Sequence, residues 1–159
     1  MKTCAYLSYK GLGANLLHLS YCHEIARKYG PITIITLCSN LEAALKDDPL
    51  IEKVIFINEF HKRFIDVLKL KKFLNTFNFY RIFIYYPSLR IYLASILSNI
   101  KKVYSYPVFK KKNLHLIEAA KIFTEKSLRI NNCPTETNFF IRKNKIEEIN
   151  KNFDKSKFK

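Results

Sequence analysis

Short apolar runs alternate with amphipathic stretches along this chain, and this alternation restricts the possible fold more than any other feature. The runs are rich in β-branched and aromatic residues and are typical of buried strands: Thr3–Ser8, Ile32–Cys38, Lys53–Asn58, Arg81–Tyr86 and Lys101–Tyr106. The stretches between and after them have apolar residues at spacings of three and four, which predict helices over Asn15–Tyr29, Leu41–Leu45, Lys62–Phe77, Leu89–Leu97 and Asn113–Glu125. Parallel neighbouring strands need a crossover of about a dozen residues. The pattern therefore predicts an α/β fold, with a Rossmann-like open parallel sheet and helices on both faces.

Length and charge set limits on organisation and partners. A chain of 159 residues with 48% hydrophobic content can bury one sizeable core but rarely two, so we expect one domain. The 28 lysines and arginines against 13 acidic residues give a net charge of +15. Such a charge attracts nucleic acid, anionic lipid headgroups or phosphorylated glycans, and it does not choose among them. The sequence has no helix-turn-helix, RNP-type strand or zinc module that would favour nucleic acid.

The cysteines and the N-terminus indicate a reduced, cytoplasmic protein. Cys4, Cys22, Cys38 and Cys133 show neither CxxC pairing nor close spacing to histidines, so they predict buried free thiols and no metal site. The first apolar run is too short for a signal-peptide core, and no run approaches the ~18 apolar residues that span a bilayer.

The stretch YKGLGANLLHLS, residues 9–20, follows the first predicted strand and carries two glycines. A dinucleotide fingerprint fails because Leu16 stands where the third glycine of G-x-G-x-x-G belongs, and a P-loop fails because Lys10 precedes the glycines. No nucleotide cofactor is therefore expected in this loop. Gly11 and Gly13 could still let backbone N–H groups contact a phosphate or a sugar. The alternative is a turn that serves only the chain path.

The order of the motifs resembles the lipopolysaccharide heptosyltransferases, glycosyltransferase family 9. The glycine loop and its helix correspond to that family's K-x-x-x-x-G-D-x-L segment, and DPLIEKV, residues 48–54, corresponds to its N-P-x-[IV]-D-[EK]-V phrase. YYPSLRIYLASILSNIKKVYSY, residues 85–106, and NLHLIEAAKIF, residues 113–123, are similar to its later strand and helix segments. The resemblance covers roughly residues 2–123 in the same order.

The resemblance implies one half of a two-domain GT-B fold, in which the N-terminal domain holds the acceptor sugar and the C-terminal domain binds a nucleotide-sugar donor. The transfer is inverting and uses no metal. Residues 1–130 would form the acceptor-side domain, and residues 131–159 a linker or the start of a donor domain. That donor domain could be a separate chain. We expect the half alone to be inactive on its lipopolysaccharide-like or other cell-surface glycan acceptor.

The resemblance also suggests site residues. The family's aspartate, its proposed general base, corresponds to Ala14, which cannot accept a proton. Asn15 could bond a sugar or cap the helix, and His18 could titrate near neutrality or be only a packed or surface residue. Ser88 and Arg90 match an S-x-R segment that would contact an acidic sugar or phosphate, the alternative being a helix cap and a solvated side chain.

His115 matches the family's helix histidine, although in isolation it would be a structural residue. The basic stretch PVFKKKN, residues 107–113, suits docking at an anionic inner-membrane surface that carries lipid-linked acceptors. The competing hypothesis is a small basic α/β module that binds nucleic acid or an anionic membrane surface.

Overall fold

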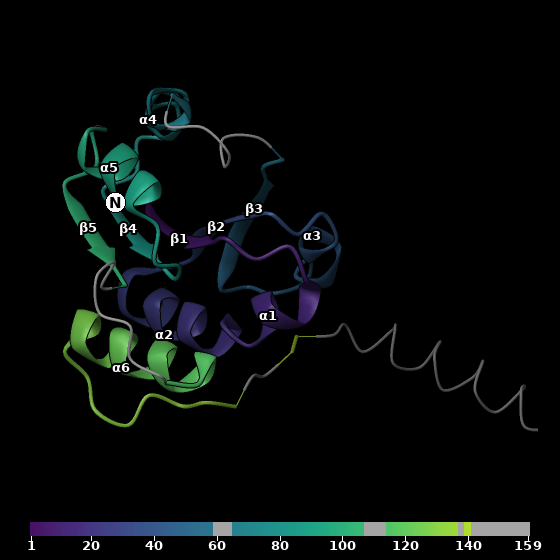
Figure 1. Cartoon of the computed structure of the whole chain (residues 1–159). Coiled ribbons are helices and arrows are strands. Elements are labelled where there is room, and N and C mark those ends of the chain that lie inside the picture. The colour runs from purple at the N-terminus through teal and green to yellow at the C-terminus, as the bar shows by residue number, and fades with distance from the viewer. Residues whose placement is uncertain (59–64, 107–113, 137–138, 141–159) are drawn as a thin grey trace, which may run out of the picture.

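A parallel sheet forms the centre of the molecule in the computed structural model, which describes residues 1–58, 65–106, 114–136 and 139–140. Its strands are β1 (Thr3–Leu7), β2 (Ile32–Thr36), β3 (Ile51–Phe56), β4 (Arg81–Ile84) and β5 (Lys102–Ser105). All neighbours pair in parallel, in the order β3-β2-β1-β4-β5 (Figure 1). The predicted open parallel sheet is confirmed.

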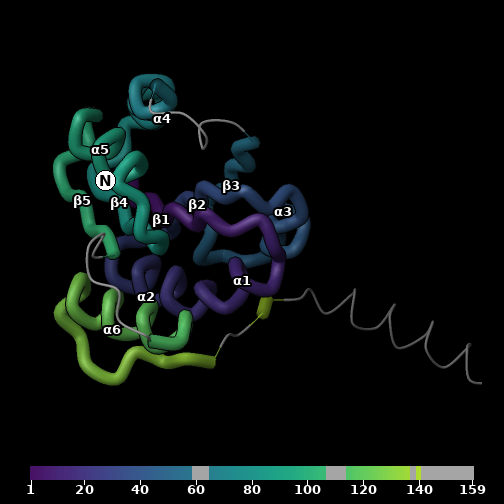
Figure 2. The backbone as a smooth tube through the Cα atoms, viewed as in Figure 1, coloured from purple at the N-terminus to yellow at the C-terminus, as the bar shows by residue number. Residues whose placement is uncertain are grey.

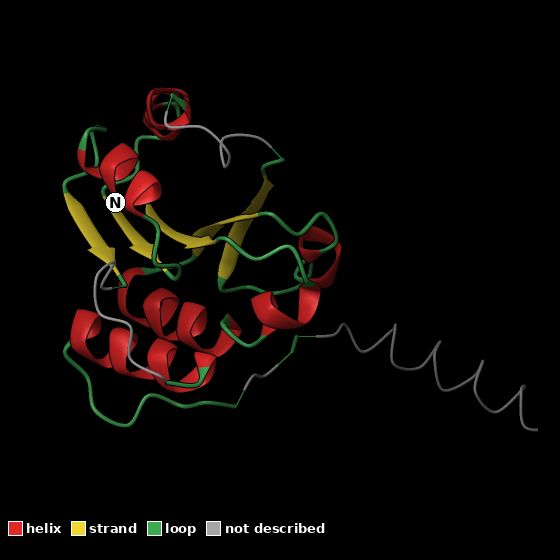
Figure 3. Ribbon diagram, in the orientation of Figure 1, coloured by secondary structure: helices red, strands yellow, loops and turns green. Residues whose placement is uncertain are grey.

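Helices cover both faces of this sheet, as predicted. They are α1 (Leu12–Leu16), α2 (Leu19–Tyr29), α3 (Leu41–Ala44), α4 (Asp66–Asn75), α5 (Leu89–Ile96) and α6 (Leu116–Leu128). The α2 and α6 helices lie on one face, and α4 and α5 lie on the other (Figure 3).

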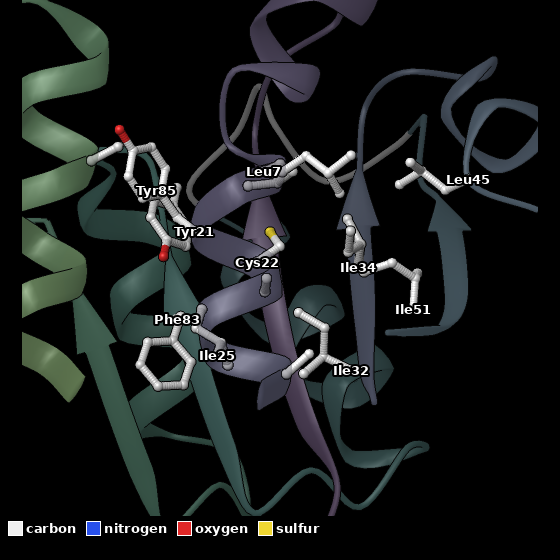
Figure 4. Close-up of a cluster of buried hydrophobic side chains, with 14 of the residues drawn as sticks. Leu7, Tyr21, Cys22, Ile25, Ile32, Ile34, Leu45, Ile51, Phe83 and Tyr85 are labelled. Carbon is white, nitrogen blue, oxygen red and sulfur yellow. The ribbon is translucent and has the colours of Figure 1, made fainter. Parts of the chain in front are cut away.

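Two hydrophobic clusters, one on each face of the sheet, hold these layers together. There are two because successive side chains of a strand point to opposite faces. Along β1, Ala5 and Leu7 join the cluster under α2 and α6, whereas Cys4 and Tyr6 join the cluster under α4 and α5. Figure 4 shows the first cluster, in which side chains from β1, β2 and β4 meet the apolar side of α2. A strand buried on both faces needs apolar residues throughout, and this explains the continuous apolar runs in the sequence.

The predicted helix over Asn15–Tyr29 is wrong in its start and its continuity. The chain forms α1 from Leu12, with Gly11 and not Asn15 at the N-cap, and then breaks before α2. The break lies at His18, whose ring Nδ1 is 2.7 Å from the carbonyl oxygen of Ala14 and whose backbone N–H donates to the carbonyl of Asn15, three residues back. The side chain thus takes the acceptor that the backbone N–H would use in a continuous helix.

Other boundaries differ by a few residues. β3 begins at Ile51 rather than Lys53, and α6 begins at Leu116, after His115, rather than at Asn113. The predicted start of the third helix at Lys62, the basic stretch at residues 107–113 and most of the expected linker lie outside the described residues.

The described chain after α6 packs back onto the domain, running along α6 toward α1 (Figure 2). Cys133 is buried in the α2 and α6 cluster, and its N–H donates to the Glu125 carboxylate over 3.0 Å. The Phe140 ring meets the His23 ring edge-on at 5.7 Å. The prediction of buried free thiols is confirmed, since all four cysteines are buried and unpaired. No helix in the described ranges is long and apolar enough to cross a membrane.

Candidate functional site

The carboxyl ends of β1 and β4 are the point where the chain leaves the sheet in opposite directions. β1 leads into α1 and α2 on one face, and the adjacent β4 leads into α5 on the other. Ligands of open parallel sheets bind in the crevice at such a switch point. Gly11 and Gly13 lie at the start of α1, and Ser88 and Arg90 lie at the start of α5, so all four follow these strand ends. His115 comes from the same edge, because it follows β5 in the chain and precedes α6.

The two glycines are exposed at this edge and leave open space in front of the backbone. A Cβ added at Gly11 or at Gly13 would meet no heavy atom within 4 Å, and φ at Gly11 is an ordinary −76°. The path of the chain therefore does not require glycine at either position. Their backbone stays accessible to a ligand at the N-terminus of α1.

Asn15 lies beneath this loop and is buried, so it holds the loop in place. Its Nδ2 donates to the carbonyls of Tyr9 and Gly11 over 2.9 and 2.7 Å, and its Oδ1 accepts from the Thr36 hydroxyl over 2.7 Å. Thr36 in turn accepts from the Cys38 N–H. Asn15 thereby ties the loop after β1 to the carboxyl end of β2, and its polar atoms are already engaged.

His18 is fully buried behind the same loop. Burial lowers the pKa of its imidazole, and the hydrogen bond to the Ala14 carbonyl opposes that effect only in part. The neutral ring donates from Nδ1, while Nε2 has no hydrogen-bond partner among the described residues. Its ring stacks on Tyr9 with centroids 4.9 Å apart. His18 therefore supports the loop from inside and does not reach a ligand at the surface.

Tyr9 and Tyr86 are site residues that the sequence analysis missed. The Tyr9 hydroxyl donates to the Tyr85 carbonyl over 2.9 Å and so bridges the two diverging loops. Burial and the neighbouring Tyr86 raise the pKa of Tyr9 to about 12, so it remains a neutral donor. Tyr86 meets Tyr9 edge-on at 5.7 Å and is 39% exposed. A tyrosine two positions after the end of each of the two strands was the available signal.

The remaining predicted residues lie at helix starts. Ser88 caps α5, where its hydroxyl accepts from the Ile91 N–H over 3.4 Å, and Arg90 is in the first turn, partly exposed. His115 caps α6 and is exposed, with its Nδ1 3.4 Å from the Ile117 N–H. Ser88 therefore has the capping role that was its alternative. His115 has a structural role, also as a helix cap. The long, weak contacts leave both side chains able to reach outward.

No group of three or more residues that could ligate a metal occurs in the described part of the chain. The carboxyl edge of the sheet provides neutral and cationic hydrogen-bonding groups. They are the backbone N–H groups of Gly11 and Gly13, the Ser88 hydroxyl, the His115 imidazole and the Arg90 guanidinium. An exposed aromatic ring lies beside them. Such a set suits a polar, anion-bearing ligand with flat apolar faces.

Comparison with solved structures gives consistent matches. The glycosyl transferase family 9 protein from Veillonella parvula matches with a TM-score of 0.64 and 12% identity, over 99% of this chain and 50% of that one. Escherichia coli ADP-heptose lps heptosyltransferase II matches with a TM-score of 0.57 and 13% identity, over 96% of this chain and 50% of that one. The E. coli heptosyltransferase WaaC with ADP-2-deoxy-2-fluoro heptose matches with a TM-score of 0.51 and 13% identity, over 86% and 51%.

No protein-family model matches the sequence, and no curated protein matches it at a significant level. The resemblance to the heptosyltransferases is thus confirmed at the level of the fold. This chain spans about half the length of the structures it matches, and its fold is similar to that of half a glycosyltransferase family 9 protein.

Proposed function

We propose that this domain is the acceptor-binding half of a heptosyltransferase-like inverting glycosyltransferase that acts on lipopolysaccharide or a similar cell-surface glycan. The proposal rests on one observation: an accessible glycine backbone lies at the switch point of this fold, together with Ser88 and Arg90. Residues 1–130 form the acceptor-side unit, and a donor domain continues the chain or belongs to a separate one.

Each group has a part in binding the acceptor. The Arg90 guanidinium pairs with a phosphate or carboxylate of the glycan, because charge-assisted hydrogen bonds are the strong ones at a surface. Gly11 and Gly13 offer backbone N–H groups, and the exposed ring of Tyr86 packs against a sugar face. His115 adds a second polar contact from the start of α6. A lipid-linked acceptor brings the domain to the inner membrane surface as a peripheral protein.

The domain lacks the group that would activate the acceptor. Ala14, at the position that resembles the family's aspartate, has a methyl side chain that cannot take the proton from a hydroxyl. A nucleotide-sugar donor, the kind of ligand that the WaaC structure with ADP-2-deoxy-2-fluoro heptose holds, would be bound by the donor domain. We therefore expect the 159-residue polypeptide to release no nucleotide from ADP-heptose in the presence of a core oligosaccharide, as measured by a nucleotide-release assay. Release above the enzyme-free blank contradicts this expectation.

A titration with a phosphorylated core oligosaccharide tests acceptor binding. Arg90→Ala should weaken binding by about 1.5–3 kcal/mol, the size of a hydrogen bond to a charged group. Lys72→Ala is the matched control, because Lys72 is exposed on α4 and is not part of this site.

Duplex DNA provides the contrasting ligand. If the +15 charge serves nucleic acid, DNA binding is measurable at low salt, and log K falls with log salt by about 0.9 for each phosphate neutralised. The acceptor proposal expects weak DNA binding that Arg90→Ala and Lys72→Ala affect alike. If Arg90→Ala and Lys72→Ala also weaken oligosaccharide binding equally, that binding depends only on diffuse electrostatic attraction. The support for an acceptor site is then removed.

A further inference from the structure

An open groove of about 1230 Å³ lies between β5, the last strand of the sheet, and α6, and Tyr9 of the candidate site contributes to its lining. One wall is formed by the outer side of β5, from Lys102 to Tyr106, and the other by the side of α6 that faces it. Leu116 and Arg129 mark the two ends of the helical wall, so the groove is about 20 Å long at the helical rise of ~1.5 Å per residue.

Polarity changes along this groove in the same direction on both walls. Along α6 the lining residues are first apolar, Leu116, Ala119, Ile122 and Phe123, and then cationic, Lys126 and Arg129. Along the opposite wall, Tyr106 and Tyr104 lie toward the carboxyl edge of the sheet and Lys102 lies at the other end.

Lys28 of α2 adds a further cation at the Lys102 end. Its ammonium donates to the Leu128 carbonyl and lies 6.0 Å from the Tyr29 ring centroid. The Arg81 guanidinium lies over that ring too, 3.9 Å from its centroid. The described lining has no acidic side chain. Cations from three elements therefore gather at one end of the groove, and no described carboxylate in its walls neutralises them.

We propose that this groove binds a single-chain alkyl phosphate, with the phosphate at the Lys102, Lys126 and Arg129 end and the apolar chain along Ile122, Phe123 and Tyr106. Three cations and an Arg-stacked tyrosine favour a doubly charged head group, and lysine and arginine are the side chains that bind phosphate. The apolar half excludes a purely polar anion such as free phosphate as the complete ligand. The groove shares Tyr9 with the candidate acceptor site, but its cationic end is at the opposite edge of the sheet, so the proposed phosphate contacts do not depend on the acceptor site.

Isothermal titration with dodecyl phosphate, below the concentration at which it forms micelles, tests this on the full chain. Binding should be saturable at one site. Decyl phosphate should bind about four- to fifteenfold more weakly, because it is two methylenes shorter and each buried methylene is worth up to about fourfold in affinity. Dodecanoate, with a single charge, should bind more weakly than dodecyl phosphate. Neutral dodecyl maltoside and inorganic phosphate alone should show no saturation in the same range.

Matched charge variants locate the site. Lys102→Gln/Lys126→Gln removes two exposed cations of the groove and should weaken dodecyl phosphate binding at least tenfold. Lys69→Gln/Lys72→Gln removes two exposed lysines of α4, on the other face of the sheet, and should leave it unchanged. Arg129 is left in place because its backbone is left-handed, with φ 53°, and a substitution there could disturb the end of α6.

Ala119→Leu tests the apolar half, because the larger side chain enters the groove and should weaken dodecyl phosphate at least threefold. Equal losses in the two lysine pairs, equal binding of dodecyl maltoside, or tighter binding of an acidic peptide that pairs with the edge of β5 would each overturn the proposal. If Arg90→Ala loses oligosaccharide binding and retains dodecyl phosphate binding, the two ligands occupy different sites.

Discussion

His18 is the residue whose burial has the most direct consequence for the response of this protein to pH. Burial lowers the pKa of its imidazole from 6.5 in the folded chain, whereas the unfolded chain keeps the ordinary value. Below about pH 6.5 the unfolded state therefore binds a proton that the folded state does not. The free energy of unfolding should decrease as the pH falls through this range, and it should be unaffected by His18 above it.

The comparison of wild type with His18→Asn measures this effect. Asparagine can donate to the Ala14 carbonyl as Nδ1 does, and it does not titrate. Urea unfolding at pH 8 gives the packing cost of the substitution, because the wild-type imidazole is neutral there. Between pH 6.5 and 5 the variant should lose less stability than the wild type. An identical loss in both proteins would assign the acid sensitivity to other groups.

At the scale of elements, two tyrosine hydroxyls attach α6 to the rest of the fold. The Tyr85 hydroxyl, just after β4, shares a hydrogen bond of 2.8 Å with the buried hydroxyl of Thr124, and the Tyr21 hydroxyl of α2 donates to the Ile117 carbonyl over 2.9 Å. Thr124→Val keeps the shape of the side chain but leaves the Tyr85 hydroxyl buried without that partner.

We expect Thr124→Val to lower the free energy of unfolding by about 1–3 kcal/mol, the cost of an unsatisfied buried polar group. Tyr85→Phe should cost less, about 0.5–1.5 kcal/mol, because Thr124 still donates to the Ala120 carbonyl. Thr76→Val is the control, since Thr76 is exposed at the end of α4 and should change stability by less than about 0.5 kcal/mol. Urea unfolding followed by circular dichroism supplies all three values.

The helices and strands that depend on the local pattern of apolar residues could be predicted from the sequence. The strands β1, β2 and β4 are buried on both faces because helices cover both, so their apolar runs could be recognised from the sequence alone. The break between α1 and α2 could not be predicted, because it depends on a side chain, His18, that competes with its own backbone for the Ala14 carbonyl. Periodicity does not report such competition.

The candidate site was predicted at the level of its loops and less well at the level of individual roles. Gly11, Gly13, Ser88 and Arg90 lie at the expected edge of the sheet. Asn15 is occupied by contacts to Thr36, 21 residues away, a pairing that only the fold creates. The buried pair of His23 and Asp48, 2.6 Å apart and 25 residues apart in the chain, was missed for the same reason.

At the scale of the whole molecule, exposed apolar side chains gather at the starts of helices along the carboxyl edge of the sheet: Leu12, Ile65, Leu68, Tyr86, Leu89 and Leu114. Each follows a parallel strand, and so they lie at one edge of the molecule. The +15 charge opposes contact between copies at low salt, and salt screens that repulsion while apolar attraction remains.

We therefore expect self-association that increases between 0.05 and 0.5 M salt, values chosen because the screening length falls from roughly 14 to 4 Å. Leu12→Ser/Leu89→Ser should reduce it, as measured by sedimentation velocity. Ile96→Ser/Leu97→Ser, two exposed apolar residues at the other end of α5, is the matched control and should leave it unchanged. A monomer at every salt concentration would show that this edge is too polar to associate.

The burial of all four thiols makes selective chemical labelling of the candidate site practicable. Burial raises the pKa of Cys4, Cys22 and Cys133, and Cys38 is only 4% exposed, so the native thiols should react slowly with maleimides. Gly11→Cys would place a thiol where an added Cβ meets nothing within 4 Å, at the rim of the loop. A fluorophore attached there would report ligand binding at the candidate site without removal of a single native cysteine.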